Sequence, residues 1–357
     1  MGDLTFRNQV LLCHLTHRPK HTLNAVIHIA DPPVREISEL RERDSSVGTL
    51  DCLPPELIFK ILNSLDARSV ACFARSCYRS NIIARSLPSY SDIVKYAPNA
   101  LLALRKVGLI GTYSVARLHR VLRSEKCARC SAFGAFLYLP RAMRCCYPCL
   151  RHNRSFQTLP DAHIKEYFDL STEDIEHLPT LQPIPGQYNP INIPTPQSRS
   201  LMSVRAARKV GIKKHGSLAQ MGMSVVTKFR WDNTVLSRIL YYQGNLKNSP
   251  RVNREPSIFS GLAAVQFPSV SKSGKVEKGL WCKGCEYNFF LYKKRRLPQS
   301  ALNELLIQNL ERFGPEASLG ARAHEAMSSK SFFKHIKRCY GARKLASMSC
   351  HRIDDQY

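Results

Sequence analysis

The stretch Leu53-Pro-Pro-Glu-Leu-Ile-Phe-Lys-Ile-Leu-Asn-Ser-Leu65 predicts an amphipathic helix that begins at its two prolines. Proline suits the first helical turn because the amide hydrogens of that turn have no partner within the helix. Glu56 follows at the positive end of the helix dipole, where a carboxylate is favoured. Five apolar side chains then recur at helical spacing and share one face, which something must cover: Leu57, Ile58, Ile61, Leu62 and Leu65.

Two further short helices are predicted directly after this one. Asp66 is suited to cap a helix that carries Val70, and Ile82, Ile83 and Leu87 indicate a third. Three helices this short cannot bury all their apolar side chains among themselves, and each fully buried Leu or Ile contributes about 1.5–3 kcal/mol. We therefore expect another protein or domain to cover them, although an ordinary three-helix part of a larger core fits the same pattern.

Cysteine pairs separated by two residues occur three times, whereas random placement of 13 cysteines in 357 residues gives about 0.5 such pairs. Cys127 and Cys130 are followed, after fifteen residues, by Cys146 and Cys149, which is the spacing of a four-cysteine zinc site. Cys145 offers an alternative register, but only Cys146 lies three positions before Cys149. The β-prone residues between the pairs predict a small hairpin that brings four thiolates around one Zn²⁺ at about 2.3 Å.

The third pair predicts a second zinc site that is completed from a distant segment. Cys282 and Cys285 enclose Gly284, which we expect to allow a tight turn, and His335 and Cys339 lie one helical turn apart. The gap between these halves leaves a helical His and a buried Cys without metal as the alternative. His14, His17 and His21 beside Cys13 also have helix-compatible spacing, but they lie in a segment with little periodicity.

The net charge of +26 raises the possibility of an anionic partner such as nucleic acid. Residues 1–50 hold six basic and six acidic side chains, so the excess is spread downstream, with dense runs at 205–214 and 293–296. A nuclear import signal, a phosphate-binding patch or a solvated loop face fits the second run. A basic, zinc-stabilised nucleic-acid-binding protein is therefore the alternative function, although it does not explain residues 53–65.

Other functional classes are disfavoured by the sequence. There is no Walker-type glycine run and no G-x-S-x-G element, and the cysteines fit closed structural sites better than catalysis, so we expect no enzyme. The chain starts with no signal pattern, and no apolar run reaches the roughly 18 residues that a membrane span requires. We expect no membrane association and a cytoplasmic or nuclear protein with reduced cysteines.

The pattern from Leu53 to Cys77 resembles the F-box, and the segments 118–149, 281–285 and 333–339 are similar to those of fungal F-box proteins with zinc-like cysteine segments. This resemblance implies a subunit that binds the SKP adaptor of a cullin-RING ubiquitin ligase and presents an unknown target protein. An F-box protein that acts outside a ligase remains open. The residues that the resemblance assigns to the adaptor contact are Leu53, Pro54, Leu57, Ile58, Ile61, Leu62, Leu65 and Val70.

The expected fold is mainly α, with a short three-helix F-box, small zinc-stabilised hairpin and helix elements, and long irregular loops. We expect six regions, in this order: a flexible extension (1–49), the F-box (50–88), a helical segment with the first zinc unit (89–155), a proline-rich and loop-rich region (156–280), a C-terminal helical region with the second site (281–345) and a tail (346–357).

Overall fold

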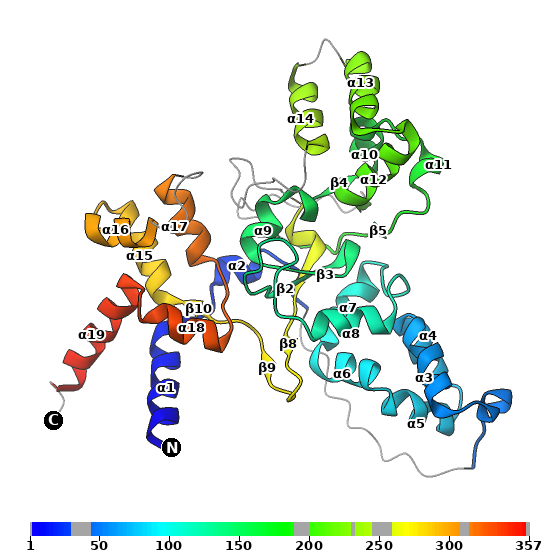
Figure 1. Cartoon of the computed structure of the whole chain (residues 1–357), viewed down its shortest axis with the longest axis horizontal. Helices are drawn as coiled ribbons and strands as arrows, with labels where there is room; N and C mark the ends of the chain where they lie inside the picture. Colours follow the sequence, from blue (N-terminus) through cyan, green and yellow to red (C-terminus); the bar gives the residue numbers. More distant parts are fainter. Residues whose placement is uncertain are drawn as a thin grey trace.

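The computed structural model describes residues 2–29, 44–186, 188, 200–229, 233–244, 259–306 and 314–354. Within these ranges the chain is mainly helical, with four sheets of only two or three strands, which confirms the expected fold class. Parts of four predicted regions lie outside the described residues: the extension at 1–49, the proline-rich region at 156–280, the C-terminal helical region at 281–345 and the tail at 346–357. Figure 1 shows groups of helices arranged around short strands near the centre.

The first helical group contains the proline-initiated segment 53–65. Prolines open α3, α6 and α7, as their missing amide hydrogens allow. The Asp66 carboxylate accepts hydrogen bonds from the backbone N–H groups of Arg68 and Ser69, at 2.8 and 3.0 Å, which confirms the predicted cap. The elements of this group are η1 (Gly48–Cys52), α3 (Pro55–Ser64), α4 (Ala67–Phe73), α5 (Tyr78–Ser86), α6 (Pro88–Tyr96), α7 (Pro98–Lys106) and α8 (Val115–Leu122).

A central three-stranded antiparallel sheet lies next to this group. Its strands are β2 (Phe136–Tyr138), β3 (Met143–Cys145) and β7 (Ala264–Gln266), with β2 in the middle. The hairpin β2–β3, turned by η2 (Leu139–Arg141), confirms the hairpin predicted between the cysteine pairs. One continuous apolar core, which we call the main core, extends from Val70 and Ile93 in the helices to Phe136, Cys149 and Trp281.

A second helical group packs around its own apolar core. The group includes the three-stranded sheet β4–β6–β5. In Figure 1 the group and the helices α3–α8 lie on opposite sides of the central strands. The prediction of a loop-rich region at 156–280 missed these helices, because the prolines that suggested loops lie between or outside them. Before this group along the chain come α9 (Tyr147–His152) and η3 (Arg154–Phe156), whose buried apolar residues pack in the main core. The group itself consists of β4 (Thr158–Pro160), α10 (Asp161–Phe168), α11 (Thr172–Ile175), β5 (Thr180–Leu181), β6 (Leu201–Ser203), α12 (Val204–His215), α13 (Leu218–Phe229) and α14 (Asn233–Gln243).

The N-terminal segment and the C-terminal helices form a third group. In place of the expected flexible extension, residues 2–29 fold as helices and a strand, and β1 pairs with β10 so that Thr16 faces Cys282. The buried Leu15 belongs to the apolar core of this group, which we call the C-terminal core. The elements of this group are α1 (Gly2–Leu15), β1 (Thr16–His17), β10 (Trp281–Cys282), α15 (Lys283–Lys293), α16 (Gln299–Leu306), α17 (Pro315–Ala323), α18 (Ser329–Ile336) and α19 (Tyr340–Asp354). Apolar residues of α2 (Lys20–Asn24), η4 (Gly261–Ala263) and β8 (Ser269–Val270) pack with the main core instead, and β9 (Val276–Glu277) pairs with β8.

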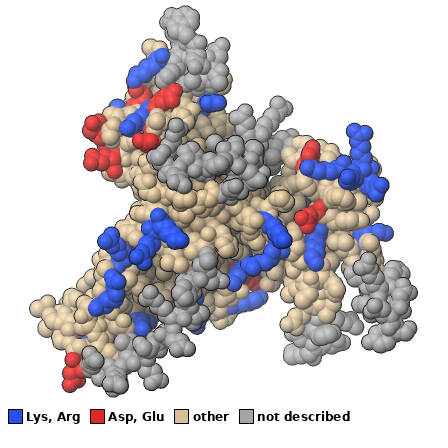
Figure 2. Space-filling view, turned by 180° about the vertical axis from the view of Figure 1, so that it is seen from behind, with Lys and Arg blue, Asp and Glu red and all other residues tan. Residues whose placement is uncertain are grey.

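The basic side chains do not gather in one place on the face that Figure 2 shows. Lys and Arg lie there in several separate groups over different parts of the molecule. Within the basic runs, Lys214 of α12 forms an ion pair with Asp174 at 2.6 Å, and Lys293 of α15 lies 4.7 Å from the centre of the Phe289 ring. Among the helices that the structure describes, none combines the length and the apolar character that crossing a membrane requires.

Candidate functional site

Helix α3 has one buried pair and one exposed pair of aliphatic side chains, which point in two directions. Ile58 and Leu62 are 6% and 3% exposed and pack with Leu87 in a small core. Leu57 and Ile61, one helical turn apart, are 46% and 45% exposed. Because exposed Leu and Ile side chains gain free energy when a surface covers them, the second direction is suited to binding.

The exposed side of α3 forms a shallow, largely apolar hollow. It is lined by Leu53, Leu57 and Ile61 together with Lys60 and Ser64. We call Leu53, Leu57 and Ile61 the α3 face; Pro54, the exposed N-cap residue of α3, lies beside it in sequence. The α3 face thus contains three of the eight residues that the F-box resemblance assigned to the adaptor.

Four of the other assigned residues, Ile58, Leu62, Leu65 and Val70, contact other parts of the chain. Val70 is fully buried in the main core, and Ile58 and Leu62 are buried beneath α3. Leu65 is half-buried, and its carbonyl oxygen accepts a hydrogen bond from the Val115 amide of α8 at 2.8 Å. Direct contact with a partner is therefore not expected from Ile58, Leu62 and Val70, because their side chains already contact other parts of the chain.

The first cysteine cluster brings together the four residues that the sequence spacing selected. The Sγ atoms of Cys127, Cys130, Cys146 and Cys149 all lie within 4.8 Å of one another, and those of Cys130 and Cys146 are 3.5 Å apart. Zn–S bonds of about 2.3 Å in a tetrahedron require sulfur–sulfur distances of about 3.8 Å. The turn after Cys127 is tight, with Ser131 in the left-handed region at φ 60°. The cluster can therefore hold a zinc ion.

Cys145 does not join this cluster. Its Sγ atom lies 3.7 Å from the Phe136 carbonyl oxygen, which it faces as a hydrogen-bond donor across the hairpin. Successive residues of a strand point to opposite sides, and Cys146, at the N-cap of α9, turns toward the other thiols. The geometry thus favours the register with Cys146 over the alternative with Cys145.

A buried arginine that sequence reasoning missed fixes the hairpin beside the first cluster. The Arg144 side chain donates to the carbonyl oxygens of Gly134, Phe267, Pro268 and Val121, at distances between 2.6 and 3.2 Å. Its burial lowers the pKa of the guanidinium to about 10. These bonds join β3 to the end of α8 and to the segment after β7. No sequence signal distinguishes this arginine from exposed ones.

The second cluster gathers Cys282, Cys285, His335 and Cys339, with all ligand atoms within 4.8 Å of one another. The Sγ atom of Cys285 lies 3.1 Å from His335 Nε2 and 4.0 Å from Cys339 Sγ. Three thiols and one imidazole form a common structural zinc set, and these spacings fit a tetrahedral ion. The four residues come from β10, α15, α18 and the turn after α18.

Gly284 has a different role from the predicted tight turn. It lies inside α15, where a Cβ atom would come within 2.1 Å of the Ala342 backbone nitrogen of α19. Gly341 meets the same constraint, because its Cβ would lie 2.2 Å from the Gly284 carbonyl oxygen. The two glycines thus allow α15 and α19 to approach closely, which places Cys339 beside Cys285.

The N-terminal histidines do not form a third cluster among the residues that the structure describes. His17 Nδ1 lies 3.2 Å from a carboxylate oxygen of Glu286, so β1 is tied to α15 beside the second cluster. Burial lowers the pKa of His17 more than Glu286 raises it. The N-terminal segment therefore packs beside the second cluster through the contacts of β1 with α15 and β10.

Hydrogen bonds among the thiols lower the pKa of some cysteines in each cluster, including Cys127 and Cys130 in the first and Cys339 in the second. Hydrogen bonds from the Cys130 thiol, and then from the other two thiols, hold the pKa of Cys127 well below the usual value near 9. Hydrogen bonds from Cys282 and Cys285 act in the same way on the pKa of Cys339. Concentrated thiolate character in a buried pocket is the environment that a divalent cation neutralises.

Comparison with known proteins identifies one part of the chain. The F-box domain matches residues 50–92, which extend from η1 into α6 and include the whole α3 face. No curated protein matches the chain, and no solved structure matches it. The similarity to fungal F-box proteins, stated from the cysteine segments, thus has no support from these comparisons.

Proposed function

We propose that this chain is the substrate-receptor subunit of a cullin-RING ubiquitin ligase and that it binds the SKP adaptor through the α3 face. The proposal rests on one observation: the residues that match the F-box domain include the exposed apolar side chains of α3. The F-box match at residues 50–92 contains Leu57 and Ile61, two apolar side chains of α3 that the chain itself leaves almost half exposed. Covering what remains exposed would contribute roughly 1 kcal/mol for each of them.

The proposed role is positional and not catalytic. F-box proteins are generally non-catalytic adaptors, and the chemistry of ubiquitin transfer belongs to other subunits of the ligase. A receptor that holds a target beside the transferring subunit raises the effective concentration of the target lysine. A rigid receptor does this best. The main core favours rigidity, because it joins F-box residues such as Val70 and Ala74 to the central sheet.

We also propose that Zn²⁺ occupies both cysteine clusters as a structural ion. Four-cysteine and three-cysteine-one-histidine sets leave no open position for a substrate, and structural zinc contributes folding free energy directly. The second and third helical groups, with their separate apolar cores, then remain as the candidate surfaces for a target protein.

The assembly of the ligase tests this function. The purified chain, mixed with the SKP adaptor and a cullin, should elute with both proteins in size-exclusion chromatography, and the cullin should join only when the adaptor is present. A complex that contains the adaptor but excludes the cullin would show an F-box protein that acts outside a ligase. A folded chain that binds neither protein would refute the proposal.

A further inference from the structure

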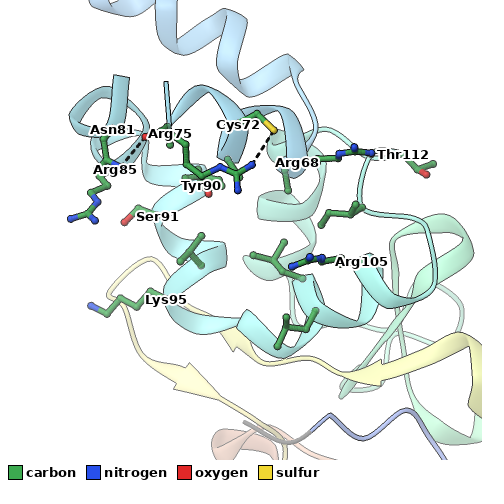
Figure 3. Close-up of a pocket in the computed structure, with 18 of the residues that line it drawn as sticks. Arg68, Cys72, Arg75, Asn81, Arg85, Tyr90, Ser91, Lys95, Arg105 and Thr112 are labelled. Atoms are coloured by element: carbon green, nitrogen blue, oxygen red, sulfur yellow. Dashed lines mark hydrogen bonds between the residues drawn. The ribbon is translucent and has the colours of Figure 1, made fainter. Parts of the chain in front are cut away.

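A large pocket lies on a different side of the F-box helices from the α3 face. It is open to solvent and has a volume of about 1290 Å³. Residues of α4, α5, α6 and α7 and of the segment after α7 line it. We call it the α4–α7 pocket (Figure 3). Aliphatic side chains dominate its interior, including Ala71, Val94, Leu101, Leu102 and Ile110. Val94 is 44% exposed, so this apolar surface is open to a ligand.

Five cationic side chains surround this apolar interior: Arg68, Arg75, Arg85, Lys95 and Arg105. Figure 3 shows Arg85 and Lys95 on one side of the pocket and Arg68 and Arg105 on the opposite side. No Asp or Glu is among the described residues that line the pocket. Within the described part of the chain none of the five forms an ion pair; Arg75 donates only to the Cys72 sulfur, at 3.4 Å.

The charge and the shape of the pocket together select the chemistry of its ligand. Cations without acidic partners favour an anionic ligand, whereas the aliphatic interior favours an apolar side chain at the centre of that ligand. The volume exceeds the roughly 300–1,000 Å³ of small-molecule sites, and this suits a peptide. Nucleic acid fits less well, because bases stack on aromatic platforms. Among the described residues that line the pocket, only the half-buried Tyr90 is aromatic.

We propose that the α4–α7 pocket binds an acidic segment of a protein, in which Asp or Glu residues flank one Leu, Ile, Met or Phe side chain. The apolar side chain enters between Val94 and Leu102, and the carboxylates lie near the surrounding cations. This inference rests on the proposed function in one respect: the acidic segment is taken to belong to the target protein of the ligase. The pocket and the α3 face share no lining residue, so both surfaces can be used together.

A peptide selection against the full chain tests the ligand class directly. Randomised twelve-residue peptides displayed on phage should yield sequences with net negative charge and one large apolar residue. The affinity of an enriched peptide, followed by fluorescence anisotropy, should fall at least tenfold between about 0.05 and 0.5 M salt, since exposed charges are screened. Enrichment of neutral or basic peptides, or tighter binding of RNA than of any selected peptide, would overturn the proposal.

Paired variants then locate the site. Arg105→Glu should weaken peptide binding at least tenfold, whereas Lys106→Glu, the adjacent exposed residue of α7 that does not line the pocket, should change it less than twofold. Val94→Ser should weaken binding, and Ile82→Ser, which alters an equally exposed side chain outside the pocket, should not. All four variants should keep the thermal transition of the parent. Equal losses within either pair would place the peptide elsewhere.

The adaptor separates this inference from the proposed function. A chain that binds the selected peptide but not the SKP adaptor would keep the pocket proposal and refute the ligase role. A peptide that the adaptor displaces would overturn the pocket proposal, because the pocket would then be part of the adaptor interface. The expected result is a ternary complex of peptide, chain and adaptor.

Discussion

The two cysteine clusters use similar ligands but stabilise different parts of the molecule. The first takes its residues from one short stretch, between Cys127 and Cys149, and is embedded in the main core that the F-box helices share. The second takes its residues from positions as far apart as Cys282 and Cys339, yet it serves a small core that also holds Leu15. Ligands that are close in sequence therefore do not imply a local structural role.

Hydrogen bonds connect the first cluster to the helix that carries the α3 face. From the first cluster, Arg144 of the hairpin donates to the Val121 carbonyl oxygen at the end of α8. At its other end, α8 begins with Val115, whose amide donates to Leu65 directly after α3. The second cluster contacts β1, α15 and α19 instead. Losing the first ion should thus disturb adaptor binding, and losing the second should not.

Removing a ligand of the first cluster should have the largest effect. Cys149→Ser should abolish the cooperative unfolding transition of the main core, or lower its stability by more than about 5 kcal/mol, because structural zinc contributes folding free energy. Metal analysis should show one zinc fewer per chain, and adaptor affinity should fall. Cys145→Ser is the matched control, since it alters an adjacent buried thiol outside the cluster and should keep both ions.

A ligand of the second cluster tests the other half of the comparison. Cys285→Ser should also release one zinc and should expose the backbone of α15 and α19 to hydrogen exchange. Adaptor affinity should stay within twofold of the parent. An affinity loss as large as that of Cys149→Ser would show that the two cores are not independent.

The link between the first cluster and α8 can be broken without touching a metal ligand. Arg144→Met keeps the unbranched apolar stem of the side chain but removes the guanidinium and leaves buried carbonyl oxygens without donors, which should cost about 4 kcal/mol. Denaturant unfolding should show this loss while the zinc content stays at the parent value. Simultaneous loss of zinc would mean that the hairpin cannot hold the thiols without this arginine.

The smallest expected effect concerns a histidine where the two parts of the molecule meet. His324 Nδ1 lies 2.8 Å from the Thr22 hydroxyl, and the ring packs against Tyr147 of α9. Burial, ahead of the nearby Arg151, lowers the pKa of His324 to about 4. The unfolded chain therefore binds this proton first as pH falls below 6.5. Its contribution to stability is complete above that pH and should fall by about 2 kcal/mol between pH 6.5 and 5.

Thiolates that bind metal also take up protons as the pH falls. The measurement therefore compares how steeply the free energy of unfolding declines with pH in the parent and in a His324 variant. Over that range His324→Gln should show a shallower decline of unfolding free energy than the parent. Parallel declines would indicate that His324 is protonated equally in the folded and unfolded chains.

Local patterns in the sequence predicted the features that depend on neighbouring residues. The Pro55 start of α3, the Asp66 cap and the hairpin between the cysteine pairs all follow from spacing and residue type. Features that depend on distant contacts could not be predicted in this way. The pairing of Thr16 with Cys282 involves strands of two residues, which have no periodicity. Similarly, Gly284 gave no sign of the helix that packs against it.

The same limit applies to the candidate binding surface. Spacing placed Leu57, Ile58, Ile61 and Leu62 on one side of a helix, but it could not show which of them Leu87 covers. Only the packing of α3 against the following helices separates the exposed pair from the buried pair.

Binding of the SKP adaptor to a variant of the α3 face tests the central claim most directly. In the double variant Leu57→Ser and Ile61→Ser, the adaptor Kd measured by calorimetry should rise at least tenfold, while zinc content and the thermal transition stay at parent values. Val94→Ser, which alters a similarly exposed side chain on α6, is the control and should leave this Kd unchanged. An unchanged adaptor Kd in a folded, zinc-loaded double variant would contradict docking through the α3 face.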